Sequence, residues 1–281
     1  MKKINIENKG ILSPENEIKI FGKNLIYLQI IKGVIKEKRF IESLWGGYCF
    51  IRYPTSNLVN YTENLSKVIN VEFIKFGFDN FDFLTRKVVS NQHSIICGEY
   101  GSPGARILYL NECLRKPKVY DPYIKDPGIY HIHDVLPLEG DRYLVSTGDS
   151  NKYLDEMIIN EYSCKILKRH LRHLGGFTAS ISIGNRVILG TDFSYRPNYL
   201  MDFYSGDKYF LPKQVWLEYI IDIKLLEPST LVITTKKLNQ PEGHIVNFCL
   251  MKNIFYSAEK VTIRESIVTK QLGDYINHET F

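Results

Sequence analysis

Paired cysteines, long apolar runs and a strong charge imbalance are all missing from this 281-residue chain. The five cysteines are an odd number without paired spacing, which indicates buried thiols in a reducing compartment and not a disulfide framework. No run approaches the roughly 20 apolar residues of a membrane span, and the first residues carry two lysines without an apolar stretch after them. We therefore expect neither a signal peptide nor an anchor, and a cytoplasmic location without membrane contact.

Several chemical signatures are missing as well. The chain has no glycine-rich phosphate loop that leads into a helix, no Gly-x-Ser-x-Gly nucleophile elbow and no Cys-x-x-Cys pairs of the zinc-ribbon type. The formal net charge of +5 is mild, and the one dense basic run, residues 165–173, is interpreted as a solvated outer strand and its connection. We therefore expect no cofactor and, since no motif that reads a nucleic-acid groove is present, no nucleic-acid partner.

The chain is rich in strand-forming residues, with 19 Tyr and 15 Phe. A short apolar run that ends in Gly or Thr and an acidic residue recurs at Glu99, Asp149 and Asp192, and weaker copies end at Arg52 and Lys236. The spacing is roughly 40–50 residues, the period of propeller blades built from four-stranded sheets. The repeat therefore predicts an all-β fold, with a single β-propeller domain over residues 1–281.

Turn signals such as Gly-Asn and Ser-Gly pairs divide each repeat into strands. The clearest blade is predicted to have strands at 131–138, 142–149, 156–162 and 164–171, and the same plan fits 81–121, 177–215 and 217–259. Another inner strand is expected at 261–268, with its missing partners within residues 3–37. This arrangement gives six blades, with five as the alternative, and a last blade closed by both termini. Residues 58–70 are compatible with a helical turn or a loop.

Polar residues gather at one edge of the predicted blades. The start of the first strand and the end of the second lie at the same edge of an antiparallel sheet. We therefore expect one rim to carry side chains from successive blades: His131, His133, Asp134, Glu99, Tyr100, Asp149, Ser150, Asp192 and Arg196. The two histidines point the same way because strand side chains alternate, which leaves Asp134 pointing oppositely unless a bulge intervenes.

A His-x-His pair on a strand could hold a metal ion if Glu99 or Asp149 supplied a third ligand. We favour a different interpretation, in which one histidine is buried and hydrogen-bonded while the other lines a pocket. The prediction is therefore a site without a metal.

Four segments follow one another at blade spacing. They are Gly98-Glu99-Tyr100, His131-Ile132-His133, Thr147-Gly148-Asp149-Ser150, and Gly190-Thr191-Asp192 followed by Pro197-Asn198-Tyr199. In this order they resemble the sialidase-like, BNR-repeat-like propeller proteins of bacteria. The Asp-box hairpin of that family and the three-arginine clamp of true sialidases have no counterpart here. The resemblance implies a propeller with a carbohydrate-related site, and does not imply sialic acid as the substrate.

Three functions fit these residues, and a glycoside hydrolase acting on a bacterial polysaccharide or oligosaccharide comes first. Two carboxyl groups that flank the scissile bond carry such chemistry, and Glu99 and Asp149 are the predicted pair, with His133 tuning or replacing one of them. The predicted substrate-binding residues are Tyr100, Arg106, His131, Ser150, Asp192, Arg196, Asn198 and Tyr199. The alternatives are a polysaccharide lyase, which would use His131 or His133 with a tyrosine, and an arginine or a metal to neutralise the uronate carboxylate, and a sugar-binding or scaffold propeller without catalysis.

Overall fold

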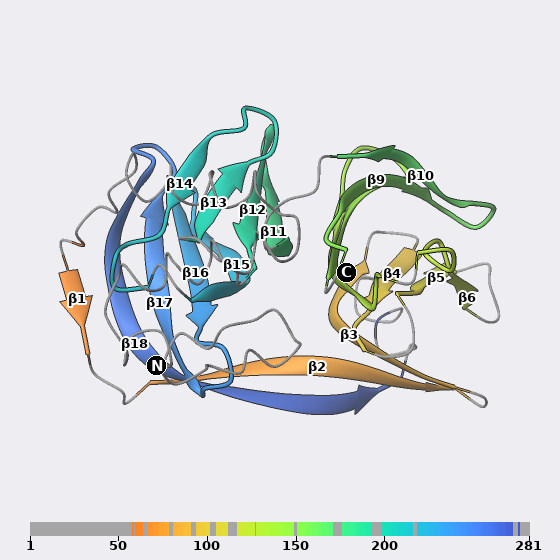
Figure 1. The fold of residues 1–281 in the computed structure, drawn as a ribbon, viewed down its shortest axis with the longest axis horizontal. Coiled ribbons are helices and arrows are strands. Elements are labelled where there is room, and N and C mark those ends of the chain that lie inside the picture. The colour runs from red at the N-terminus through yellow and green to blue at the C-terminus, as the bar shows by residue number, and fades with distance from the viewer. Residues whose placement is uncertain are drawn as a thin grey trace, which may run out of the picture.

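The structure is a computed structural model that describes residues 58, 60–63, 67–78, 81–90, 94–101, 105–111, 117–126, 128–148, 151–170, 176–192, 198–215, 218–271 and 275. In this part of the chain eighteen strands form several sheets, which confirms the all-β prediction (Figure 1). No helix in the described residues has the length and apolar character needed to cross a membrane.

Four consecutive units of antiparallel strands make up most of the fold. The first unit contains β3 (Phe81–Ser90), β4 (Ser94–Glu99), β5 (Ile107–Asn111) and β6 (Lys118–Tyr120). The second contains β7 (His131–Pro137), β8 (Arg142–Gly148), β9 (Leu154–Ile159) and β10 (Cys164–Arg169). The third contains β11 (Phe177–Ile183), β12 (Arg186–Thr191), β13 (Tyr199–Asp202) and β14 (Lys208–Phe210). The fourth contains β15 (Tyr219–Glu227), β16 (Thr230–Lys236), β17 (Glu242–Cys249) and the first part of β18 (Ile254–Lys270).

Strand β18 joins the fourth unit to the first. Its first half pairs antiparallel with β17, whereas Thr262–Lys270 pairs parallel with β2 (Val68–Phe78), which continues into a hairpin with β3. The fourth unit, β18, β2 and the first unit thus belong to one ten-stranded sheet, and β2 and β18 run side by side along the lower edge of Figure 1. The short strand β1 (Asn60–Thr62) also pairs parallel with β18.

Two predictions for these linking segments need correction, and two others fall outside the described residues. The unit 217–259 and the strand at 261–268 were expected as separate elements, but Ile254–Lys270 is one continuous strand that spans the end of the first and all of the second. The stretch 58–70, interpreted as a helical turn or a loop, contains β1 and the start of β2. The partners expected for 261–268 within residues 3–37 lie outside the described residues, as does the predicted closure of a ring by both termini.

The apolar core lies between neighbouring units. Ile96 of the first unit and Ile132 and Val145 of the second share one cluster of buried side chains. A second cluster joins the second and third units, and a third cluster joins the third and fourth, where Phe248 is fully buried. Each such side chain contributes about 1.5–3 kcal/mol when it leaves water. The second strands β8 and β12 are buried along almost their whole length, because the side chains on their two faces pack in different clusters.

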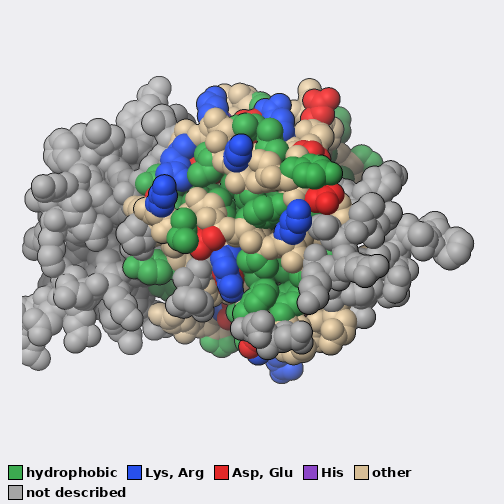
Figure 2. Space-filling view, turned by 90° about the vertical axis from the view of Figure 1, so that its right-hand side faces the viewer, with side chains coloured by type: hydrophobic (Ala, Val, Ile, Leu, Met, Phe, Trp, Pro, Cys, Tyr) green, Lys and Arg blue, Asp and Glu red, His purple; other side chains and the backbone are tan. Residues whose placement is uncertain are grey.

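The outer strands of the units face solvent. Residues 165–169 of β10 are exposed, which confirms for this part of the basic run the prediction of a solvated outer strand. Lys and Arg side chains lie scattered over the face that Figure 2 shows, with acidic and apolar groups between them.

Candidate functional site

A register shift interrupts the first strand of every unit. It lies between Thr85 and Val88 in β3, and at the corresponding points of β7, β11 and β15, where each strand pairs with the second strand of its unit. Such bulges redirect side chains out of the normal alternation and are common beside active sites. The redirected stretches carry a notable set of side chains: Arg86, Lys87, His133, Thr178 and Ile221.

Polar contacts made near these bulges tie the four first strands together. Asp134 is buried and faces Lys87 Nζ at 3.1 Å, and it accepts a hydrogen bond of 2.6 Å from Ser180 Oγ. Arg86 Nη2 donates to the carbonyl of Ile221 at 3.1 Å, which links β3 to β15. Asp134 therefore points toward β3 and β11 and away from the histidines, as the alternation of strand side chains predicts.

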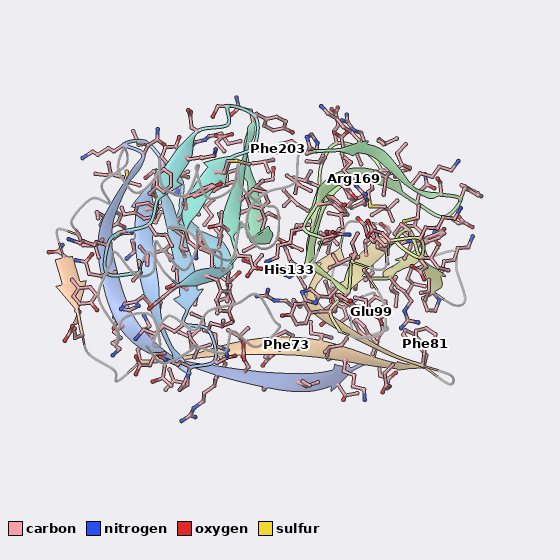
Figure 3. All side chains as sticks on the ribbon, viewed as in Figure 1. Phe73, Phe81, Glu99, His133, Arg169 and Phe203 are labelled. Atoms are coloured by element: carbon pink, nitrogen blue, oxygen red, sulfur yellow. The ribbon has the colours of Figure 1, made fainter. Side chains whose placement is uncertain are left out.

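The two predicted histidines form a close pair, and Figure 3 places His133 near the centre of the molecule. His131 Nε2 lies 2.6 Å from His133 Nε2, and the rings stack with centroids 4.5 Å apart and an interplanar angle of 18°. At this distance one nitrogen donates its hydrogen and the other accepts it. Gly148 lies directly beneath the pair, since a Cβ at that position would overlap both rings.

His133 is a buried, neutral base. Burial lowers the pKa of His133 well below its ordinary value, and the neighbouring His131 and then Arg86 and Lys152 lower it further. Its Nδ1 atom is buried without a hydrogen-bond partner among the described residues. An imidazole in this state is uncharged at neutral pH and can accept a proton.

Tyr100 and Arg86 complete the surroundings of the pair. The Tyr100 ring centroid lies 4.6 Å from that of His131 and 6.0 Å from that of His133. The guanidinium carbon of Arg86 lies 5.3 Å from the Tyr100 ring centroid and 6.0 Å from that of Phe73. Within the part of the chain that the structure describes, no carboxylate forms an ion pair with Arg86. We call Arg86, Tyr100, His131, His133 and Lys152 the inner cluster.

Two ion pairs lie at the edge of the inner cluster, and Lys152 of the cluster takes part in the first. Lys152 Nζ lies 2.9 Å from Asp192 Oδ2, and Lys236 Nζ lies 2.5 Å from Glu265 Oε2. Tyr219 lies close to them, and the pKa of its phenol is raised, first by burial and then by the charge of Glu265. Asp192, a predicted substrate-binding residue, thus lies beside the cluster with its carboxylate bound to a lysine.

Glu99 lies on the other side of its strand from Tyr100. The backbone N–H of Glu99 bonds to the third strand of its unit in the same way as that of Thr147 in the second unit. Like Thr147 Oγ1, which accepts from the Tyr153 N–H at 2.9 Å, Glu99 Oε2 accepts from the Arg106 N–H, at 3.3 Å. The Glu99 carboxylate therefore takes the place of the Thr147 hydroxyl, which has a structural role in the second unit.

Arg106 holds the Glu99 carboxylate with two further hydrogen bonds. Its Nε donates to Oε2 at 2.8 Å and its Nη2 donates to Oε1 at 2.5 Å. The hydrogen bond to Glu99 raises the pKa of the guanidinium further. The structure thus brings together a predicted catalytic and a predicted substrate-binding residue, but as an ion pair in which each satisfies the other.

The remaining predicted residues divide into two groups. Asn198 and Tyr199 are buried; Asn198 Nδ2 donates to the carbonyl of Glu218 at 2.5 Å, and Tyr199 packs on Phe210. Asp149, Ser150 and Arg196 lie outside the described residues. No group of three His, Cys, Asp or Glu side chains in the described chain is placed to hold a metal ion.

Sequence reasoning missed the cationic members of the inner cluster. Arg86 and its neighbour Lys87 are charged residues in the middle of a predicted first strand, and Lys152 follows a predicted second strand. An adjacent pair of cations inside an otherwise apolar strand was the available signal, because such charges seldom lie in a core without a partner.

Comparisons with known proteins give no close relative. No family model matches the chain, and no curated protein matches it. One solved structure that partly superposes is a Bacteroides fragilis protein proposed to be exported, with 11% identity and a TM-score of 0.38 over 72% of this chain and 74% of that one. Another is a puromycin-hydrolysing peptidase of Mycobacterium tuberculosis, with 10% identity and a TM-score of 0.26 over 65% of this chain and 43% of the peptidase. These values are too low to support an argument.

Proposed function

We propose that the four units are blades of a β-propeller and that the inner cluster is its functional site. Contacts between the first strands of consecutive units support this arrangement, because inner strands surround the axis of a propeller. Six blades, with five as the alternative, and kinship with the sialidase-like propellers remain part of the proposal. The number of blades depends on residues 1–57, which are outside the described residues.

The proposed activity is that of a polysaccharide lyase acting on an acidic sugar. The observation that carries it is a neutral, buried His133 paired with His131, beside a tyrosine and beside Arg86, which has no carboxylate partner in the described chain. Elimination next to a uronate needs a base for the proton beside the carboxylate, a cation for that carboxylate and an acid for the departing oxygen. The inner cluster contains a residue of each kind.

Each residue of the cluster then has a definite role. Arg86 binds the uronate carboxylate and stabilises the charge that develops on it as the adjacent C–H bond breaks. The histidine pair accepts that proton, with His133 uncharged beforehand because burial lowers its pKa. The electron pair of the C–H bond forms the new C=C bond, the glycosidic C–O bond breaks, and the Tyr100 hydroxyl protonates the leaving oxygen.

The lyase takes precedence over the hydrolase because of Glu99. A glycoside hydrolase that used Glu99 would have to free its carboxylate from Arg106, which holds both oxygens. The histidine pair needs no such rearrangement. A propeller that only binds acidic sugar is the third possibility, and the same experiment separates all three.

The test is to incubate the full chain with polygalacturonate, alginate and hyaluronan and to follow the ultraviolet absorbance of unsaturated products. His133→Gln and Arg86→Gln should each lower turnover by roughly 10²–10⁴-fold, the usual loss when an acid–base or charge-stabilising group is removed. Glu156→Gln, at an exposed ion pair on β9, serves as the control and should retain activity. Saturated products would indicate the hydrolase, and binding without any product would indicate a binding protein.

A further inference from the structure

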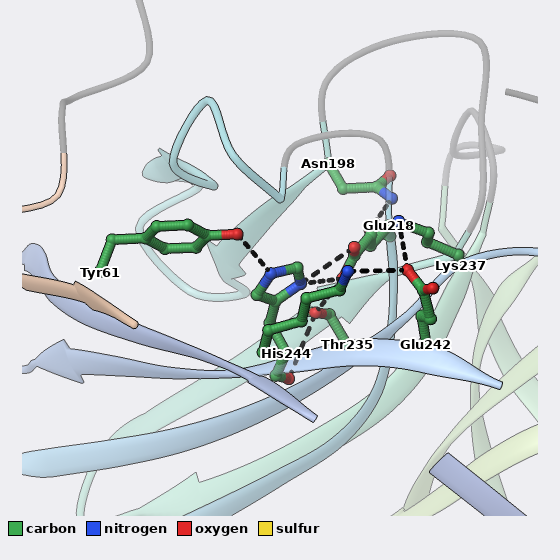
Figure 4. Close-up of polar contacts among 8 residues, drawn as sticks. Tyr61, Asn198, Glu218, Thr235, Lys237, Glu242 and His244 are labelled. Atoms are coloured by element: carbon green, nitrogen blue, oxygen red, sulfur yellow. Dashed lines mark hydrogen bonds and ion pairs between the residues drawn. The ribbon is translucent and has the colours of Figure 1, made fainter. Parts of the chain in front are cut away.

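A second polar network lies outside the inner cluster, where β1 meets the fourth unit. Figure 4 shows Tyr61 of β1 facing His244 of β17, with Glu218 and Thr235 behind the imidazole. We call these four residues the Tyr61 relay. Glu218, Thr235 and His244 are buried, whereas the Tyr61 side chain reaches solvent.

The buried end of the relay fixes the orientation of the His244 ring. Both Glu218 oxygens lie at hydrogen-bond distance from His244 Nδ1, at 3.0 and 2.9 Å, and Thr235 Oγ1 donates to Oε2 at 2.7 Å. A carboxylate can only accept, so the imidazole carries its hydrogen on Nδ1. The lone pair of Nε2 therefore faces outward, toward the tyrosine.

Tyr61 occupies the outer end of the relay. Its hydroxyl lies 3.1 Å from His244 Nε2, and its ring stacks on the imidazole at 5.7 Å with an interplanar angle of 29°. Burial and the charges of Glu63 and Glu218 raise the pKa of the phenol, so that at neutral pH it keeps its hydrogen and donates it to Nε2. The residue remains 37% exposed.

The order of groups is that of an activated nucleophile: a hydroxyl, an imidazole that can take its proton, and a buried carboxylate that orients the imidazole. We propose that Tyr61 is a nucleophile for acyl donors such as esters, with His244 as its general base and Glu218 as the positioning residue. This activity is separate from the proposed lyase and uses no residue of the inner cluster.

The reaction balances within these groups. The Tyr61 oxygen attacks the carbonyl carbon of an ester while its proton moves to His244 Nε2. The tetrahedral intermediate then expels the alkoxide or phenolate, which takes the proton from the imidazolium or leaves as the anion while the proton passes to water. The product is an ester of Tyr61, which water can hydrolyse with His244 again as base. The charge of the nearby Lys237 ammonium partly offsets the rise in the pKa of Tyr61. Lys237 Nζ itself lies 2.8 Å from Glu242 Oε2.

A network that only holds β1 against the fourth unit would leave Tyr61 no more reactive than other surface tyrosines. Two such tyrosines serve as internal controls, since Tyr204 is 63% exposed and Tyr162 is 88% exposed. Accessibility alone would make both of them react before Tyr61. General-base assistance, typically worth ~10²–10⁴-fold, would reverse that order.

The experiment treats the full chain with 4-nitrophenyl acetate at neutral pH and locates the acetyl groups by peptide mass mapping over time. We expect Tyr61 to be acetylated at least about tenfold faster than Tyr204 and Tyr162, in line with general-base assistance. Equal or slower labelling of Tyr61 in the wild-type protein overturns the proposal without the need for any variant.

Variants then assign the roles. Tyr61→Phe should remove that acetyl group and leave the labelling of Tyr204 unchanged. His244→Gln and Glu218→Gln should bring the Tyr61 rate down to that of Tyr204, with folding checked by the unfolding transition. If a folded His244→Gln variant labels Tyr61 as fast as the wild type, then His244 is not the base and the proposal fails.

Discussion

Replacing Glu99 with glutamine tests whether this residue supports the fold or the chemistry. The substitution keeps the size of the side chain but removes the charge that faces Arg106, and it places an amide group against guanidinium donors. Glu99 accepts bonds from Arg106 Nε at 2.8 Å, Nη2 at 2.5 Å and the backbone N–H at 3.3 Å. The variant therefore leaves a cation and a backbone N–H short of an acceptor.

The expected loss can be bounded from the geometry. Breaking a fully buried ion pair costs about 3–5 kcal/mol, because the remaining charge stays unpaired. Glu99 is buried, but the Arg106 side chain is 23% exposed and keeps some water, so we expect a loss at or below the lower end of that range, about 2–3 kcal/mol. In urea this should lower the unfolding midpoint by on the order of 1 M.

Urea unfolding followed by circular dichroism measures the effect, and Glu156→Gln is the matched control. Glu156 pairs with Arg142, whose side chain is 50% exposed, so water screens this pair and its loss should hardly change the unfolding midpoint. A double variant with Met at positions 99 and 106 should recover part of the loss, since an apolar pair leaves no charge unpaired. If Glu99→Gln is as stable as the wild type, the structural role is wrong and a catalytic role for Glu99 regains its place.

Three further predictions concern the histidine pair and the core. Gly148→Ala should destabilise the protein by about 1–3 kcal/mol in urea unfolding because its Cβ would displace both histidine rings, whereas Gly77→Ala, whose nearest neighbour is 4.0 Å away, should be close to neutral. Because the pKa of His133 is lowered in the folded chain, the unfolded chain binds a proton there more readily than the folded chain once the pH falls to the ordinary pKa of histidine. Stability should therefore fall between pH 7.5 and pH 5.5, by less in His133→Gln, as followed by urea midpoints at each pH. Phe248→Ala should cost about 3–5 kcal/mol, because Phe248 is fully buried between the third and fourth units, and a loss below 1 kcal/mol would contradict that packing.

Most strands could be predicted from the sequence because each ends in a turn with its own signal. The pair Gly184-Asn185 marks the hairpin between β11 and β12, and Gly184 has a φ of 58°, which favours glycine. The strands predicted at 131–138 and 142–149 each differ from the observed strand by one residue at the end. Strand β2 was missed because it lies between the weak copy that ends at Arg52 and the first unit predicted from residue 81, where no turn signal marks a strand.

The site was harder to predict because the face of a strand depends on the register to within one residue. The repeated sequence motif placed Glu99 and Asp192 at equivalent positions of their units. The pairing of the second strands with the third strands instead makes Glu99 equivalent to Thr191, and Tyr100 equivalent to Asp192. Glu99 thus turns toward Arg106, and Tyr100 turns toward the histidines. The bulges in the first strands add a second shift, and no single-sequence pattern locates them.

Contacts between units were beyond prediction for a different reason. Arg86 reaches a carbonyl on β15, and Tyr61 reaches His244, across 135 and 183 positions of the chain. The path of the chain in three dimensions decides such contacts, and that path is not encoded in local spacing. Pairs of polar residues far apart in the sequence therefore became visible only in the folded chain.

The parallel pairing of β2 with β18 has a consequence for the folding of this protein during its synthesis on the ribosome. Val68 of β2 meets Thr262 of β18, so nearly the whole chain must be made before the two strands can pair. At the usual 5–20 residues per second, β2 waits roughly 10–40 s after its own synthesis with the edge that β18 will cover still open. An open strand edge is a template for pairing with other chains. Nascent copies on one messenger should therefore depend on slow initiation or on chaperones that bind extended segments to keep their β2 strands apart.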